Sequence, residues 1–286
     1  MKTFLRRTLV VLASFIFLIP LHAQVKQPRV VATTTWTAAF AAAAGAANIV
    51  TLAPANLRHP AEYELTPSDV AALHGADLIV STGFEVMAKR LAEAAGSQRI
   101  RVVQIGADYS LHTMRSSLMA IAAVTGTNDT ARASIDALES LVAAWKEELS
   151  GKHLLGASVL VHVFQLPLMQ ELDFKVKGVF GPGPLEAAQI AKLSATDAAL
   201  IIDNWHNEVG SPLRETLPNA RYASLINFPG PDGTISLLDV LADNRKRLAE
   251  AATNPPAGAQ NPPPAAQNPP GSKPPVGGPN PPPAAQ

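Results

Sequence analysis

Five residues of types that bind metal ions fall at or just after the ends of stretches that look like β-strands. They come from both halves of the chain and are His59, His112, His162, Asp203 and His206. In open α/β sheets, ligands bind beyond the carboxyl ends of the strands, because loops and helix N-termini converge there. One such histidine alone is more often a hydrogen-bonded structural residue. The whole set, contributed by two regions far apart in sequence, favours a metal site.

The residue types indicate which metal this site would prefer. Neutral imidazole suits zinc and other late first-row ions, whereas manganese, calcium and magnesium ask for more oxygen. Three histidines and one carboxylate would complete a tetrahedral zinc site, and a closed set of four protein ligands fits binding without catalysis. The fourth ligand stays open between Asp203, which could instead cap a helix, and His206, which could instead be a surface residue beside Trp205.

The elements that must position these residues follow an α/β pattern. Short β-branched apolar runs predict buried strands at 29–35, 48–53, 77–82, 100–105, 157–162, 174–180, 198–203 and 221–226. In the second half, helices are expected near 165–172, 184–193, 207–217 and 236–252. Strands that alternate with helices predict parallel sheets with helices on their faces.

One long amphipathic segment separates the two sets of strands. Residues 128–152 place apolar side chains at helical spacing, and about 20 helical residues would extend roughly 30 Å. We therefore expect two doubly wound α/β lobes joined by one long linking helix, with the ligand site in the cleft between them. The expected organisation is a signal peptide at 1–23, an N-terminal lobe at 27–127, the linking helix at 128–152, a C-terminal lobe at 153–253 and a disordered proline-rich tail at 254–286.

The first 23 residues predict export. Lys2, Arg6 and Arg7 precede an apolar run that is too short to span a bilayer, and a small residue, Ala23, offers a cleavage point. An uncleaved signal anchor is the alternative. The chain has no cysteine, which excludes disulfides, thiolate metal sites and a lipid-modified cysteine. The periplasm is the expected compartment.

Charge and composition limit the partners. The 23 basic and 23 acidic residues of the whole chain become 20 and 23 once the signal and its three basic residues are removed. This balance argues against nucleic acid as a partner. The tail holds 13 of the 25 prolines and predicts a semi-extended, solvated spacer, with a specific docking motif as the alternative.

Two segments resemble a known family. "HPAEYELTPSDVAALHGADLIVSTG" (59–83) and "VHVFQLPLMQELDFKVKGVFG" (161–181) resemble segments of the metal-binding solute-binding proteins that serve zinc and manganese ABC importers. The resemblance extends over the globular region. It implies capture of a divalent metal ion, zinc or manganese, by a non-catalytic protein that delivers it to an ABC permease in the inner membrane. It also implies that His112 and His162 are the second and third ligands. We also expect the protein to be a monomer.

The chain departs from the family pattern at two ligand positions. Where the family has its first histidine, this chain has Ala61, and His59 lies two residues earlier. Such a shift moves a side chain by up to ~7 Å in an extended loop, so His59 can serve only if the loop is remodelled. In the C-terminal lobe, Asp232 is not clearly equivalent to the aspartate of many relatives, while Asp203 stands where relatives carry a glutamate.

Two other functions fit part of the pattern. An exported zinc metalloenzyme would use the same histidines, with Glu62 or Glu208 as general base, but no compact zinc-protease motif supports it. A protein of the same fold could instead bind a chelated metal or a small organic ligand, with Trp36, Tyr63 and Trp205 as stacking walls.

Overall fold

The computed structural model describes residues 27–152, 154–253 and 256. The predicted signal peptide lies outside these residues, as does nearly all of the proline-rich tail. Within the described part of the chain, no helix is long and apolar enough to cross a membrane.

The N-terminal lobe is built around a parallel sheet with the order β2-β1-β3-β4. Its strands are β1 (Arg29–Ala32), β2 (Asn48–Thr51), β3 (Leu78–Ser81) and β4 (Arg101–Gln104). The helices are α1 (Thr35–Ala43), α2 (Pro67–Ala72), α3 (Ala88–Gln98) and α4 (Leu111–Thr125), and a 3-10 turn spans Pro60–Glu62. The central strand β3 is buried along its whole length, as expected of a strand covered on both faces.

The C-terminal lobe repeats this arrangement with the order β6-β5-β7-β8, again all parallel. Its strands are β5 (Ser158–His162), β6 (Lys175–Phe180), β7 (Leu200–Asn204) and β8 (Arg221–Leu225). Its helices are α6 (Leu166–Glu171), α7 (Ala187–Ser194), α8 (Ser211–Thr216) and α9 (Leu237–Thr253), with 3-10 turns at Val163–Gln165 and Trp205–Asn207. The two lobes with parallel sheets confirm the predicted fold class.

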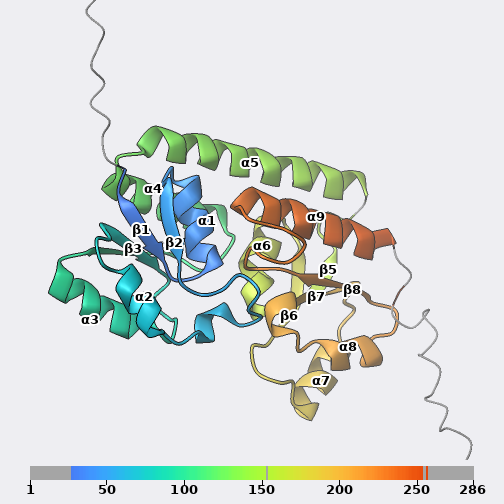
Figure 1. Cartoon of the computed structure of the whole chain (residues 1–286). Helices are drawn as coiled ribbons and strands as arrows, with labels where there is room; N and C mark the ends of the chain where they lie inside the picture. The colour runs from blue at the N-terminus through green and yellow to red at the C-terminus, as the bar shows by residue number, and fades with distance from the viewer. Residues whose placement is uncertain (1–26, 153, 254–255, 257–286) are drawn as a thin grey trace, which may run out of the picture.

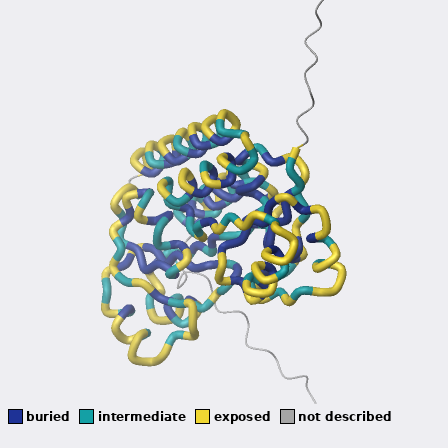
Figure 2. The backbone as a smooth tube through the Cα atoms, turned by 90° about the vertical axis from the view of Figure 1, so that its left-hand side faces the viewer, coloured by how far each residue is buried: buried dark blue, intermediate teal, exposed yellow. Residues whose placement is uncertain are grey.

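The linking helix α5 (Asn128–Gly151) runs along both lobes, with α9 beside it (Figure 1). It buries one face through residues at helical spacing: Ala131, Ile135, Leu138, Val142, Trp145 and Leu149. These side chains join one hydrophobic cluster that also contains Val30 of β1 and Val159 of β5. The buried backbone follows the sheets and the inner sides of the helices (Figure 2). The two lobes therefore share one core through α5.

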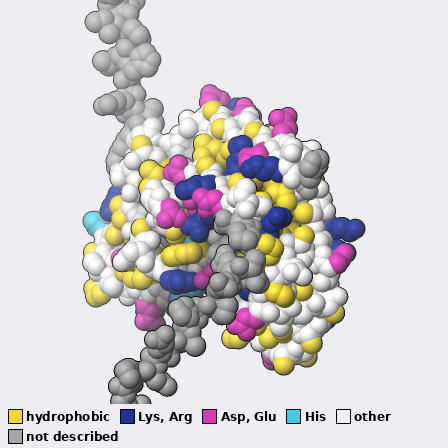
Figure 3. All heavy atoms as spheres, turned by 90° about the vertical axis from the view of Figure 1, so that its right-hand side faces the viewer, with side chains coloured by type: hydrophobic (Ala, Val, Ile, Leu, Met, Phe, Trp, Pro, Cys, Tyr) yellow, Lys and Arg dark blue, Asp and Glu magenta, His cyan; other side chains and the backbone are white. Residues whose placement is uncertain are grey.

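The outer surface of the C-terminal lobe mixes charges of both signs. On the face shown in Figure 3, basic and acidic side chains lie next to one another, with hydrophobic side chains between them. Arg247, for example, is paired with both Asp232 and Asp243. Charges of both signs therefore neighbour one another on this face.

Candidate metal-binding cleft

A cavity of about 330 Å³ lies between the lobes, at the carboxyl ends of the strands. Every one of the eight strands is followed by at least one residue that lines it. The lining comprises Trp36, Arg58, His59, Pro60, Ala61, Glu62, Thr82, Phe84 and Ala107 from the N-terminal lobe and Phe164, Pro182, His206, Asn207, Asn227 and Phe228 from the C-terminal lobe. The cavity thus occupies the place where this topology is expected to bind a ligand.

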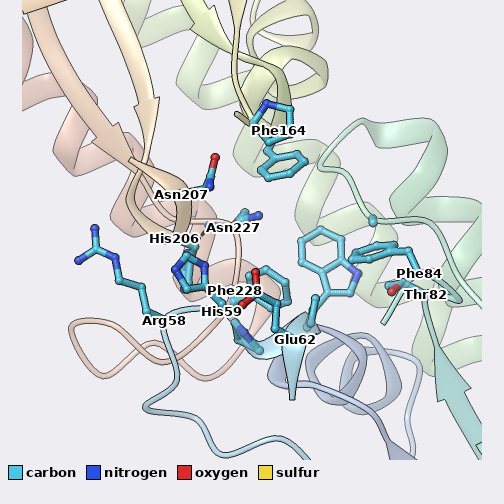
Figure 4. Close-up of a pocket in the computed structure, with 15 residues that line it drawn as sticks. Arg58, His59, Glu62, Thr82, Phe84, Phe164, His206, Asn207, Asn227 and Phe228 are labelled. Atoms are coloured by element: carbon cyan, nitrogen blue, oxygen red, sulfur yellow. Dashed lines mark hydrogen bonds between the residues drawn. The ribbon is translucent and has the colours of Figure 1, made fainter. Parts of the chain in front are cut away.

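The walls of the cavity are largely aromatic (Figure 4). Trp36 is fixed at the base: its ring packs edge-on against Tyr109 at 4.6 Å and Phe228 of the other lobe at 6.3 Å, and its Nε1 donates to the Gly106 carbonyl at 3.0 Å. Phe84 and Phe164 come from opposite lobes and stay 59% and 44% exposed. A ligand with apolar surface would cover both rings.

A buried carboxylate shapes the loop that carries Phe84. Glu85 accepts hydrogen bonds from the Thr33 hydroxyl at 2.6 Å and from the backbone N–H groups of Thr82 and Gly83 at 2.8 and 2.7 Å. Gly83 has a φ of +87°, a conformation that side chains other than glycine rarely adopt. The loop after β3 is therefore tightly held, and Phe84 projects from it toward the cavity.

The loop after β2 brings Arg58 and His59 to the cavity. The Arg58 guanidinium lies 4.9 Å from the Trp205 ring centroid and 3.4 Å from a Glu208 carboxylate oxygen, so it contacts the opposite lobe. His59 precedes the 3-10 turn at Pro60–Glu62 and is exposed on the cavity side. The shifted histidine thus does line the cleft, next to Ala61.

His206 faces His59 from the C-terminal lobe. It is only 4% exposed, and its turn is held by the Asn204 side chain, whose oxygen accepts the backbone N–H of His206 at 2.9 Å. Burial above all, then the nearby positive charge of Arg58, lowers the pKa of His206 to about 4, and His59 adds to this effect. The imidazole is therefore neutral at pH 7, the form that binds a metal.

His162 lies at the end of β5, as predicted, but both its ring nitrogens are engaged. Nδ1 accepts the Phe164 backbone N–H at 3.1 Å, and Nε2 lies 2.9 Å from Oδ1 of Asn207, which requires the proton to sit on Nε2. The ring is fully buried against Gly181, where any Cβ would clash with it. His162 therefore supports the cavity wall from behind and does not line it.

Asp203 is likewise a buried structural residue. Its carboxylate accepts the backbone N–H groups of Asn204 at 2.8 Å and Gly210 at 2.7 Å, and the Tyr222 hydroxyl at 2.7 Å. Burial, followed by the charge of Asp203, raises the pKa of that tyrosine. The helix-cap alternative considered from the sequence is not observed either, because Asn204 and not Asp203 caps the 3-10 turn at Trp205–Asn207.

His112 lies away from the cleft. It is the second residue of α4, exposed, and does not line the cavity. Among the described residues, no three histidine, aspartate or glutamate side chains come close enough to hold a metal ion together. Of the five residues that the sequence singled out, the structure brings together only His59 and His206.

Other predicted residues also take different places. Tyr63 packs into the N-terminal lobe and donates to Asp69, so it forms no cavity wall, and Trp205 lies beneath Arg58. Trp36 is a wall, as predicted. The sequence reasoning missed Arg58, Phe84, Phe164 and Phe228, because it searched the strand ends for metal ligands alone. All four lie in loops that follow strands, so a search of these loops for residues of every type would have found them.

Comparison with known proteins agrees with this architecture. Residues 30–129, which span the N-terminal lobe and the first two residues of α5, match the model of the family described as zinc-uptake complex component A, periplasmic. No curated protein matches the chain.

Several solved structures share the fold. The solute-binding protein FpvC of Pseudomonas aeruginosa in complex with Ni²⁺ is 19% identical, with a TM-score of 0.62 over 79% of this chain and 97% of that one. AdcAII of Streptococcus pneumoniae is 16% identical, with a TM-score of 0.61 over 79% and 99%. A Mn-bound periplasmic metal-binding protein of Candidatus Liberibacter asiaticus is 14% identical, with a TM-score of 0.59 over 79% and 100%.

These findings confirm the resemblance inferred from the sequence. The chain has the two-lobed fold of metal-binding periplasmic solute-binding proteins, and its N-terminal lobe carries the sequence pattern of their zinc-uptake component A family.

Proposed function

We propose that this protein captures a divalent metal ion in the periplasm and delivers it to an ABC permease without catalysing a reaction. The observation that carries the proposal is that His59 and His206, one from each lobe, line the same cavity. A ligand held by both would join the lobes, as expected of a binding protein whose permease recognises the loaded form. The family match and the fold of metal-bound relatives support the same function.

In this proposal, His59 and His206 supply imidazole ligands. A ligand histidine needs an acceptor for the proton on its other nitrogen. In the structure, His206 Nδ1 accepts the Asn227 backbone N–H at 3.4 Å, so metal binding through Nε2 would require the ring proton to move to Nδ1. The acceptor that this proposal assigns to that proton is the Asn227 side-chain oxygen, which is buried without a hydrogen-bond partner among the described residues. Imidazole ligands favour zinc over manganese, which would draw on oxygen donors such as Glu62.

The enzyme alternative has less support from this geometry. Glu208, one candidate general base, pairs with Arg58 and accepts the Tyr222 hydroxyl at 3.1 Å. Both contacts occupy its carboxylate, and Glu208 does not line the cavity. Glu62 lines the cavity, but no group of three histidine, aspartate or glutamate side chains is present among the described residues to hold a catalytic zinc beside it.

Zinc titration tests the proposal. Metal-free protein beginning at Gln24 should bind one zinc ion with sub-micromolar affinity in isothermal titration calorimetry. His206→Ala and His59→Ala should each weaken binding at least about tenfold, since even partners of metal ligands cost this much when removed. His112→Ala is the matched control, because it removes an exposed imidazole outside the cavity. Absence of zinc binding, both as the free ion and as a chelate, or a loss confined to His112→Ala, would refute the proposal.

A further inference from the structure

We propose that the metal enters this cavity as a complex with a small planar organic chelator that carries a carboxylate. The chelator, and not the protein, would complete the coordination shell of the ion. This inference rests on the proposed function, because it names the chemical form in which the cargo binds.

The size of the cavity exceeds what an ion needs. Zinc lies about 2.0–2.3 Å from each of its donor atoms. The cavity of about 330 Å³ could hold roughly ten water-sized groups, given about 30 Å³ for a water molecule in the liquid. It reaches the range of about 300–1,000 Å³ that is typical of sites for small organic ligands.

The cavity offers fewer protein donors than a closed metal site requires. Zinc takes about four ligands in a closed site. Here only two imidazoles line the cavity, because the ligand atoms of His162 and Asp203 already form internal hydrogen bonds. In the described part of the chain, no group of three suitable side chains exists. A bidentate chelator would supply the two donors that remain.

The aromatic walls match a planar organic molecule and contribute nothing to a bare ion. Phe84 and Phe164 approach the cavity from opposite lobes (Figure 4), with 59% and 44% of their surface exposed. Trp36 and Phe228 also line it. A flat ligand that covers such rings removes their apolar surface from water, which favours binding. Offset or edge-on contacts between rings add to this stabilisation.

The positive charge of Arg58, which lines the cavity, favours an anionic chelator over a bare dication. Arg58 lines the same cavity as His59 and His206, so its positive charge would repel an uncompensated metal ion. Its guanidinium has five N–H donors, and in the described structure only one side chain, Glu208, accepts from it. A carboxylate on the chelator could take the free donors in a bidentate pair.

A buried hydroxyl adds a second polar contact for such a ligand. Thr82 lines the cavity and is 8% exposed, and its Oγ1 has no hydrogen-bond partner within the described residues. A buried hydroxyl without a partner leaves a hydrogen bond unmade, so a ligand oxygen that accepts from it would bind more tightly.

Zinc and pyridine-2-carboxylate, a planar bidentate chelator, provide the test. Zinc is titrated into metal-free protein with and without the chelator, and native mass spectrometry counts what is bound. We expect the chelator to tighten zinc binding at least tenfold and to form a complex of one protein, one zinc and one chelator. A closed protein site would instead make the chelator a competitor that strips zinc from the protein.

The outcomes separate this inference from the proposed function. If zinc binds alone and the chelator only competes for it, the inference fails and the proposed function stands. If zinc binds neither alone nor with the chelator, the proposed function fails. If the chelator binds equally well without zinc, the cargo is organic and both fail.

Two variants with matched controls locate the chelator. Phe164→Ala should abolish the gain in zinc affinity that the chelator gives. Leu155→Ala should keep this gain, because it truncates an apolar side chain of nearly equal exposure (43%) outside the cavity. Arg58→Gln should reduce the gain, whereas Arg115→Gln, in a half-exposed ion pair with Glu139, should not. Equal behaviour of each variant and its control would overturn the inference, and thermal unfolding verifies that all four fold.

Discussion

Two buried histidines of the C-terminal lobe show how neighbours decide the role of a residue. His162 and His206 both follow buried strands, and burial lowers the pKa of each. His162 has hydrogen bonds at both ring nitrogens, whereas His206 has one long contact, at Nδ1, and lines the cavity. An imidazole that has already committed both nitrogens cannot bind a metal without losing those bonds, so position alone does not identify a ligand.

Asp203 gives a prediction at the same scale. Asp203→Asn keeps the shape but replaces one carboxylate oxygen with an NH₂ group that faces a donor, either the Asn204 N–H or the Gly210 N–H with the Tyr222 hydroxyl. We expect a loss of roughly 2 kcal/mol in the free energy of unfolding, measured by urea denaturation. Asp197→Asn, at an ion-paired side chain that is 78% exposed, should cost about 0–1 kcal/mol. Equal losses would contradict the structural role of Asp203.

Residue types explain why the candidate site was only partly predictable. Histidine and aspartate at strand ends were found because their chemistry is distinctive, and His59 and His206 do meet at the cavity. The sequence does not show that Asn207 and the Phe164 backbone form hydrogen bonds with the two ring nitrogens of His162. Those contacts depend on how the loops after β5 and β7 pack. Tertiary hydrogen bonds of this kind leave no periodic signal in a sequence.

At the scale of elements, the strands were predictable and the loops were not. Continuous β-branched runs such as β3 and β7 bury both faces, and few alternatives fit such a pattern. The segment between β2 and α2 has no such pattern. Its course depends on single contacts, such as the Val86 N–H that donates to the Ala61 carbonyl at 3.0 Å. That segment nevertheless carries His59 and Arg58 into the cleft.

The start of α2 gives a prediction that depends on pH. Thr66 caps the helix, and Asp69 accepts from the Thr66 backbone and hydroxyl at 2.7 Å each and from the Tyr63 hydroxyl at 2.8 Å. Partial burial raises the pKa of Asp69, but these hydrogen bonds outweigh it and hold the pKa below its ordinary 3.8. The ionised form therefore stabilises the fold above pH 3.8, and this stabilisation is lost as the pH falls through the lowered pKa.

Asp69→Ala should accordingly cost about 1 kcal/mol in the free energy of unfolding at pH 7, a typical cost for a lost helix cap. The difference from the unchanged protein should shrink as urea denaturation is repeated at pH values below 3.8. Asp129→Ala is the control, because that side chain in the first turn of α5 is 99% exposed. A difference that stays constant down to low pH would show that the charge of Asp69 does not matter.

At the scale of the whole molecule, two sheets of the same strand order direct all eight carboxyl ends to one cavity. The helix α5 fixes this arrangement, because its buried face contributes to the core that both lobes share. The Arg58 contacts with Glu208 and Trp205, and the Thr35 hydroxyl that donates to the Pro229 carbonyl at 2.8 Å, close the lobes around the cavity. Ligand contacts on both sides would add to this closure.

The central claim is that a metal ion binds between His59 and His206. Anomalous scattering at the zinc absorption edge, measured on crystals of the zinc-loaded protein, tests it most directly. We predict one strong anomalous peak in the cavity, within about 2.0–2.1 Å of a ring nitrogen of each histidine. A peak beside His162 and Asp203, or peaks only at surface side chains such as His112, would contradict the claim.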